Sequence, residues 1–346
     1  MEPLVSLIVP VYNAEAFLPA GLLALRGQTH RHIEIILVND GSTDQSGDLC
    51  DRAAGEDARI RVIHQENRGV GPARNAGIAA ARGEYLMFPD ADDTPLPHMV
   101  ATLVAAAEQS GAEVTLCGYQ AFDGDGQREQ VTLPEQLLEG HEAVRRFAAS
   151  LVPLGVVGYP WNKLYKREFI VANHLQFPPM RRFQDGVFNL EVFHHATCVQ
   201  VVAEPLYRYK LNDLTGIFQK FPADMFCLLC EITEAFYGKL STWGLSPAEY
   251  KKNIRPFFLN GVVGCVDCLY SPAWGMNAPA RRAYLRRLAA HPLVLRCGTD
   301  TAGLSRSAAL VVGLLRRRRF RTLLWAARGK LTLKRHGHPL FRLLRG

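Results

Sequence analysis

The stretch Tyr85–Asp93 constrains the fold of this chain more than any other part of the sequence, because an apolar run there ends in a cluster of acids. The run Tyr-Leu-Met-Phe, closed by Pro89, is typical of a short buried strand. Asp90, Asp92 and Asp93 follow it directly. In open α/β sheets, ligands bind at the carboxyl ends of the strands. Carboxylates crowded there repel one another, and a divalent cation, Mg²⁺ or Mn²⁺, relieves the repulsion and shares its ligands with substrate phosphates. The alternative interpretation is a solvated acidic turn.

Strands and helices alternate along the first third of the chain, which predicts βαβ units in a largely parallel sheet with helices on both faces. We expect strands at residues 4–9, 33–38, 60–64, 85–88 and 113–118, and helices at residues 15–26, 45–54, 73–82 and 96–110. Asp44 is expected to cap the second of these helices. From about residue 218 onward the apolar spacing is helical. The sequence therefore predicts an α/β domain at residues 1–217 and a helical C-terminal domain at residues 218–346.

The composition is that of a globular protein of about two domains, with 346 residues, 48% hydrophobic and 21% charged. The sequence has no apolar run as long as a membrane span and no signal-peptide pattern at its start. We therefore expect a cytoplasmic protein whose eight cysteines are thiols. Two Cys-x-x-Cys pairs, Cys227/Cys230 and Cys265/Cys268, lie in apolar helical sequence and are interpreted as core residues, with a zinc site as the alternative.

Positive charge is concentrated at the C-terminal end. The net charge is +7, but the part from Arg281 onward contains 17 Lys and Arg against one acid, Asp300. Apolar side chains at helical spacing beside Arg316–Arg319 predict a basic amphipathic helix, and they are Phe320, Leu323, Leu324, Trp325 and Leu331. Such a helix suits an anionic membrane surface, to which each Lys or Arg contributes about 1 kcal/mol. The alternative is a helix that packs on the protein body with solvated arginines. No nucleic-acid-binding motif accompanies the charge, so nucleic acid is not expected as a partner.

Two further residues indicate a nucleotide ligand. Asp40 ends the second predicted strand, in the turn Asn39–Asp44. Its carboxylate could accept a hydrogen bond from a nucleobase ring N–H, with the base stacked on Tyr12, although turn formation alone would also explain it. Arg74 lies at the start of the next predicted helix, where it could bind a ligand phosphate in a bidentate manner or pair with a neighbouring acid.

Four motifs, in this order, resemble those of the family-2 glycosyltransferases, which are inverting, bacterial-type enzymes with the GT-A fold. The motifs are Ser6-Leu-Ile-Val-Pro-Val-Tyr-Asn13, Val38-Asn-Asp-Gly-Ser-Thr-Asp44, Asn67-Arg-Gly-Val-Gly-Pro-Ala-Arg-Asn-Ala-Gly77 and Pro89-Asp-Ala-Asp-Asp93. The match extends over residues 4–215. The resemblance implies a Rossmann-like GT-A domain with a mostly parallel central sheet, and a UDP-sugar as donor.

The resemblance also implies roles for individual residues. Asp40 would hold the uracil, and Asp92 would bind a Mn²⁺ or Mg²⁺ ion on the donor diphosphate. The other residues implied to bind the nucleotide-sugar are Pro10, Val11, Tyr12, Asn13, Glu15, Asn67, Arg74, Asp90 and Ala91.

The catalytic base implied by the family is Asp185, in Phe183-Gln-Asp-Gly-Val-Phe188, where Gln184 replaces the usual Glu. Inversion by direct displacement needs one base to remove the proton of the acceptor hydroxyl. Asp185 would also suit the N-cap of the helix that follows, and the two roles are compatible. The residues predicted to contact the acceptor are Asp93, Trp161 and Lys163, with core packing as the alternative for Trp161.

Together these features predict a metal-dependent transferase acting on a glycan or polyprenyl-diphosphate-linked glycan acceptor in cell-surface polysaccharide synthesis, peripheral to the inner face of the membrane. The sequence lacks the Gln-x-x-Arg-Trp motif and the membrane spans of processive synthases, which indicates single additions. A sugar-nucleotide nucleotidyltransferase is one alternative, but residues 9–15 lack the Gly-rich phosphate loop that it would need. An inactive binding scaffold is the other, and the intact Asp90, Asp92 and Asp185 argue against it.

Overall fold

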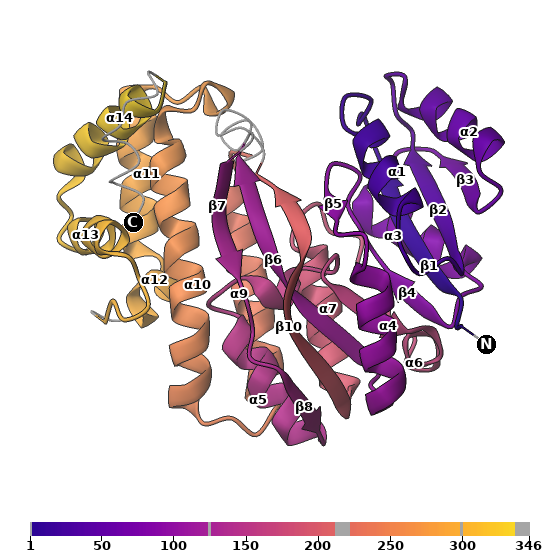
Figure 1. The fold of residues 1–346 in the computed structure, drawn as a ribbon. Coiled ribbons are helices and arrows are strands. Elements are labelled where there is room, and N and C mark those ends of the chain that lie inside the picture. The colour runs from indigo at the N-terminus through magenta and orange to yellow at the C-terminus, as the bar shows by residue number, and fades with distance from the viewer. Residues whose placement is uncertain (1, 124–125, 212–221, 298–299, 336–346) are drawn as a thin grey trace. The chain divides into compact units, whose positions relative to one another are not determined.

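The computed structural model describes residues 2–123, 126–211, 222–297 and 300–335 (Figure 1). The chain divides into two compact units, the first made of residues 1–148 and 157–212 and the second of residues 149–156 and 213–346. The domain boundary predicted near residue 217 lies outside the described residues.

The first unit is built on a mixed sheet of ten described strands, in the order β3-β2-β1-β4-β9-β6-β10-β5, with β7 paired to β6 and β8 to β10. Strands β3, β2, β1 and β4 are mutually parallel, as are β6 and β10. This confirms the predicted α/β fold class. The antiparallel strands extend the sheet beyond the parallel strands that the alternation of strands and helices predicts. The strands are β1 (Val5–Val11), β2 (Ile33–Asp40), β3 (Ile60–Gln65), β4 (Tyr85–Met87), β5 (Thr94–Pro95), β6 (Val114–Asp123), β7 (Gly126–Val131), β8 (Gln136–Glu139), β9 (Lys163–Lys166) and β10 (Cys198–Lys210).

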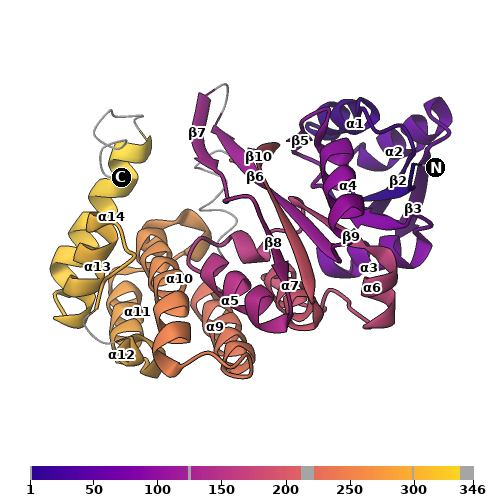
Figure 2. The ribbon, with the colours of Figure 1, turned by 60° about the horizontal axis from the view of Figure 1, so that its bottom comes forward.

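Helices cover both faces of the parallel strands. Figure 2 shows α1 and α2 on one side of β1–β3 and α3 on the other, as right-handed crossovers between parallel strands require. Helix α3 begins at Val70, three residues earlier than expected, so the loop after β3 is short. The helices are α1 (Leu18–Arg26), α2 (Ser46–Glu56), α3 (Val70–Ala80), α4 (Met99–Ser110), α5 (His141–Leu151), α6 (Arg167–Ala172) and α7 (Gln184–His195), with the 3₁₀ turn η1 at Val156–Gly158.

The central strands are buried on both faces, which explains their nearly continuous apolar sequence. A group of aromatic rings surrounds the buried Trp161, which stacks on Tyr207 and Tyr159 at centroid distances of 4.5 and 4.7 Å. Phe88, directly after β4, makes an edge-to-face contact with Phe177 at 5.1 Å. These rings anchor the segments that carry the candidate site.

The second unit is helical, as predicted. Its elements are α9 (Met225–Ser241), α10 (Pro247–Asp267), η2 (Cys268–Tyr270), η3 (Pro272–Trp274), α11 (Ala278–Ala290), α12 (Pro292–Arg296), α13 (Arg306–Arg316) and α14 (Phe320–Arg335). Ser246 and Glu249 form a capping box at the start of α10, which satisfies two backbone N–H groups there. All eight cysteines are free thiols, as expected, and the described residues hold no cluster of three His, Cys, Asp or Glu suited to a metal ion, zinc included.

Helix α14 is the predicted basic amphipathic helix, but its apolar side is largely occupied within the unit. Leu323 and Ala327 are buried, and the helix packs on α10, α13 and η2. Trp325 is instead 79% exposed. In the described part of the chain, no helix combines the length and the apolar character needed to cross a bilayer.

Candidate active site

The carboxyl ends of β1, β2 and β4 carry most of the predicted nucleotide-binding residues. These neighbouring strands are parallel, so they end at one edge of the sheet. Pro10 and Val11 close β1, Asp40 closes β2, and Asp90 follows β4 by three residues. The topology therefore gathers at one edge residues that are far apart in the sequence.

Asp40 is buried and holds the loop that leads into α3. Its Oδ1 accepts hydrogen bonds from the Gln65 side-chain amide at 2.7 Å and the Arg68 backbone N–H at 2.9 Å. Its Oδ2 accepts one from the Gly69 N–H at 2.8 Å. Each carboxylate oxygen has about two acceptor positions, so Oδ2 retains one for a donor such as a nucleobase N–H. Both interpretations of Asp40, turn formation and base binding, are compatible with this geometry.

The segment after β1 presents an aromatic ring to solvent above a rigid turn. Tyr12 is 51% exposed, as a stacking surface for a base requires. Asn13 adopts φ of 49°, and its Oδ1 accepts a hydrogen bond from the Thr43 N–H at 2.8 Å. Glu15 Oε2 accepts one from the Gln45 N–H at 2.9 Å. These bonds join the loops after β1 and β2, so Asn13 and Glu15 shape the edge.

Asp44 lies one residue before the N-cap position of α2, which is Gln45, and Gln45 makes no side-chain capping bond. The Asp44 carboxylate nevertheless accepts a hydrogen bond at 2.9 Å from the N–H of Ser46, the first residue of α2, as a capping side chain does. It also accepts one from the Glu15 N–H at 3.2 Å. The turn after β2 is thereby tied to the segment after β1, a long-range contact that the local sequence does not reveal.

Arg74 is buried in α3 and pairs with Asp90, with 2.7 Å between Nη2 and Oδ1. Its guanidinium carbon lies 5.2 Å from the centroid of the Phe177 ring. Nε and Nη1 are buried without a hydrogen-bond partner in the described part of the chain. Because buried donors without partners are costly, these two N–H groups favour a bound anion such as a phosphate. Asn67 lies exposed on the loop before α3.

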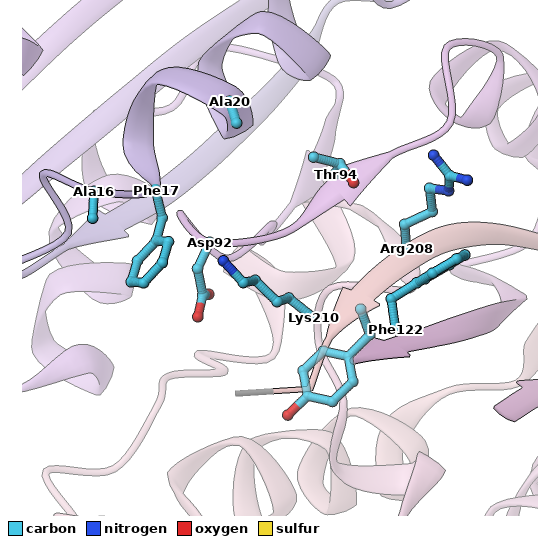
Figure 3. Close-up of a pocket in the computed structure, with 9 residues that line it drawn as sticks. Ala16, Phe17, Ala20, Asp92, Thr94, Phe122, Arg208 and Lys210 are labelled. Carbon is cyan, nitrogen blue, oxygen red and sulfur yellow. The ribbon is translucent and has the colours of Figure 1, made fainter. Parts of the chain in front are cut away.

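Asp90 and Asp92 differ in environment. The backbone N–H of Asp90 donates a hydrogen bond to the Tyr207 hydroxyl at 3.0 Å. Burial, with Asp92 and Asp185 nearby, raises the pKa of Asp90 against the opposing effect of Arg74. Asp92 is half-buried and lines a pocket of about 380 Å³ (Figure 3). Asp92 is thus the acid of the cluster that an incoming ligand can reach from this pocket.

Asp93 and Ala91 are buried. The Asp93 carboxylate accepts a hydrogen bond from the Lys210 N–H at 2.7 Å, which joins the acid cluster to β10. Burial, and the carboxylates of Asp90 and Asp92, hold the pKa of Asp93 well above its ordinary value. Its interior position favours a structural role over the predicted contact with an acceptor.

Asp185 lies in the first turn of α7, after Phe183, which has φ of 61°. Its own Oδ1 accepts a hydrogen bond from the Gly186 N–H at 2.8 Å. Burial raises the pKa of Asp185, and Arg74 lowers it in part. Since Asp185 in turn raises the pKa of Asp90, the two carboxylates share one neighbourhood, although they lie far apart in the sequence. Gln184, which directly precedes Asp185, is buried.

Trp161 and Lys163 lie in the interior rather than at the surface of the site. Trp161 is 2% exposed within the ring stack, as its core alternative predicted. Lys163 is fully buried, and its Nζ donates to the Tyr159 carbonyl and to Asn162 Oδ1. Burial lowers the pKa of Lys163 to about 7. Both positions favour support of the site over contact with an acceptor.

Strand β10 contributes residues that the sequence analysis did not select. Tyr207 and Tyr209 stack on Trp161, and Arg208, Tyr209 and Lys210 line the pocket beside Asp92. Tyrosine and a basic residue alternate in Leu206-Tyr-Arg-Tyr-Lys210, which is typical of a strand whose two faces differ. This pattern was the available signal, but it does not indicate which element the strand faces.

Fold and site together define an α/β protein of the GT-A type. The sequence profile described as Glycosyl transferase family 2 matches residues 6–170. EpsH of Bacillus subtilis is 35% identical over 264 residues, which cover 74% of this chain and 74% of EpsH. The chain therefore belongs to glycosyltransferase family 2.

Two solved structures share the fold at low identity. The Staphylococcus aureus protein TarS, residues 1–349 in complex with UDP-GlcNAc, has a TM-score of 0.60 at 18% identity, covering 96% of this chain and 92% of that one. The mannosyltransferase PcManGT of Pyrobaculum calidifontis, in complex with GDP-Man and Mn²⁺, has a TM-score of 0.54 at 16% identity, covering 95% and 87%. These likenesses concern the fold.

Proposed function

We propose that this protein transfers a hexosyl or N-acetylhexosaminyl group from a UDP-sugar to a hydroxyl of a glycan or polyprenyl-diphosphate-linked glycan, with inversion, in cell-surface polysaccharide synthesis. The observation that carries the proposal is the convergence of Asp185, from α7, with Asp90, after β4. One carboxylate can then act on the acceptor while the others hold the donor. The UDP-GlcNAc bound by TarS supports a uridine nucleotide as donor.

In this proposal Asp185 removes the proton of the acceptor hydroxyl. Burial raises its pKa, which makes its carboxylate a stronger base than an exposed aspartate. The Gly186 N–H fixes one carboxylate oxygen and leaves the other for the hydroxyl. Arg74 and Asp90 hold each other in place, and the two guanidinium N–H groups of Arg74 that lack a partner among the described residues, Nε and Nη1, would donate to a donor phosphate.

The donor set fits a hard divalent cation bound with few protein ligands. The described residues hold no group of three metal-binding side chains, and Mg²⁺ commonly uses one or two carboxylates plus substrate phosphates. Asp92, which lines the pocket, would hold the Mn²⁺ or Mg²⁺ ion. The ion supplies positive charge that stabilises the departing diphosphate.

Release of UDP from a panel of UDP-sugars, with Mn²⁺ or Mg²⁺ and candidate acceptors, tests the proposal. Asp185→Asn should lower turnover by about 10²–10⁴-fold, the usual contribution of a general base, while UDP affinity stays unchanged. Asp48→Asn, an exposed acid on α2, is the matched control and should retain full activity. UDP release unaffected by Asp185→Asn, or no UDP binding at all, would refute the proposed function.

We also propose that the helical unit binds an anionic membrane surface, which would make the enzyme peripheral to the cytoplasmic leaflet, where a polyprenyl-linked acceptor would lie. The contact would use the outer side of α14, where the exposed Trp325 stands one turn from Arg321 and from Arg328. An aromatic ring flanked by arginines is typical of interfacial helices. The sequence predicts that the apolar side of this helix contacts the membrane, but Leu323 of that side is buried within the protein, so the proposed contact uses the outer side.

Point variants of the full chain test membrane binding without uncovering the core under α14. Flotation with anionic liposomes should fall for Arg321→Gln/Arg328→Gln and for Trp325→Ala. The control, Arg31→Gln/Arg52→Gln, removes two exposed charges from the first unit and should float like the wild type. Equal flotation of all four proteins would contradict this second proposal.

A further inference from the structure

A pocket of about 380 Å³ opens beside Asp92, within the first unit (Figure 3). Its walls come from the start of α1, from the segment between Asp92 and β5, and from β6 and β10. The volume is within the range of small-molecule sites and exceeds what a single phosphate needs, so a sugar ring with a substituent would fit.

Two cations of β10 line this pocket and are held there by aromatic rings. The Arg208 guanidinium carbon lies 4.7 Å from the centroid of Phe122, and Lys210 Nζ lies 3.9 Å from that of Phe17. Residues 208 and 210 share one face of the strand, because side chains alternate along it. Among the described residues neither cation has a carboxylate partner within 4.0 Å. Their N–H groups are therefore available to an anion.

The pocket is separate from the residues assigned to the nucleotide. Tyr12, Asp40, Asn67, Arg74 and Asp90 do not line it, and Asp92 is the one residue of the predicted site that does. Because Asp92 is proposed to stand at the donor diphosphate, the pocket adjoins the reacting end of the donor and lies apart from the residues assigned to the nucleoside. Its occupant should therefore belong to the acceptor.

We propose that this pocket is an acceptor subsite that binds a phosphate group carried by the acceptor sugar, through Arg208 and Lys210. The planar guanidinium matches two phosphate oxygens, and the ammonium supplies a second positive charge. The rings of Phe17 and Phe122 provide an apolar wall beside the two cations. The inference rests on the proposed function, which places the donor diphosphate at Asp92. It adds the chemical class of the acceptor, a phosphorylated sugar.

Calorimetric titration of the full chain tests the subsite with glucose 6-phosphate as the charged probe and glucose as the neutral control. UDP affinity is measured first, and the probes are then added to protein saturated with UDP and Mg²⁺, at constant ionic strength. Glucose 6-phosphate should bind and glucose should bind at least about tenfold more weakly, since one charge-assisted contact is worth about that factor. Arg208→Gln and Lys210→Gln should each weaken the charged probe by about tenfold and leave UDP affinity unchanged.

Arg52→Gln, an exposed arginine of α2, is the matched control and should bind both ligands like the wild type. Three results would overturn the subsite: no glucose 6-phosphate binding at UDP saturation, equal weakening in Arg52→Gln, or a tenfold loss of UDP affinity in Arg208→Gln or Lys210→Gln. The last would assign the two cations to the donor diphosphate. If the wild type does not bind UDP, the proposed function fails, and the probe titrations on nucleotide-free protein still decide whether the pocket binds phosphate.

Discussion

Replacement of Tyr207 by phenylalanine removes a hydroxyl group that positions the acid cluster. The hydroxyl of Tyr207 accepts a hydrogen bond from the Asp90 N–H at 3.0 Å, and its ring stacks on Trp161 at 4.5 Å and 14°. Tyr207→Phe keeps the ring and removes the oxygen. The change therefore leaves the packing of the core intact, deprives the Asp90 backbone N–H of its partner and also removes the hydrogen bond between the Tyr207 hydroxyl and the Asp93 carboxylate.

The expected loss of stability follows from that N–H. A buried donor left without an acceptor costs about 1–3 kcal/mol, so the free energy of unfolding should fall by about that amount in urea denaturation. The midpoint of thermal unfolding should fall by about 2–4 °C for each kcal/mol, the scale of a domain of this size. The loss of activity should be larger than the loss of stability, because the Asp90 backbone that loses its hydrogen bond also carries Asp92. A shift of these side chains by about 1 Å can lower turnover by about 10²-fold.

Tyr85→Phe is the matched control. The Tyr85 hydroxyl donates a hydrogen bond to Glu108, and Tyr85 lies at the start of β4, away from the acids that follow the end of the strand. This variant should lose less stability, because water can replace the hydroxyl at the exposed Glu108, and it should keep its rate of UDP release. If Tyr207→Phe retains full activity, or if both variants lose activity equally, the positioning role of Tyr207 is refuted.

Three further outcomes are expected. Burial raises the pKa of Asp185, so the base should become protonated at a pH above about 3.9, the ordinary pKa of an aspartate. The rate of UDP release should therefore begin to fall above that pH as the solution is acidified, which a pH–rate profile measures. A rate that stays constant down to a pH of about 3.9 would contradict this. The same shift means that the folded state binds this proton more tightly than the unfolded state, so stability is lost as pH rises through the raised pKa, and Asp185→Asn should unfold at higher urea concentration than the wild type at pH 8. Gly21→Ala should destabilise by about 1–3 kcal/mol and slow UDP release, since its Cβ would stand 2.7 Å from the Ala91 carbonyl oxygen, whereas Gly55→Ala, with open space around it, should be neutral or stabilising by thermal denaturation.

Much of the architecture was predictable because its signals are local. The alternation of buried strands with helices, the helical periodicity after residue 218 and the acids that follow an apolar strand all recur within a few residues of one another. Parallel strands must then end at a common edge, so the gathering of Pro10, Asp40 and Asp90 there follows from the alternation itself.

Tertiary packing decided what no local pattern contains. Arg74 pairs with Asp90, and α7 places Asp185 beside that pair. Both arrangements depend on contacts between segments that are distant in the sequence. Burial of Trp161 likewise depends on where β10 lies, since Tyr207 of that strand stacks on it, and burial of Lys163 depends on the position of β9 between β4 and β6.

The sequence by itself therefore determined the two kinds of structure in the chain and the edge at which its acids meet, since hydrogen bonding and periodic apolar spacing act over short distances. The tertiary structure alone decided which acid lines the pocket, which cations line it with that acid and which side of α14 stays exposed. Those outcomes follow from the desolvation and packing of side chains that only the folded chain brings together.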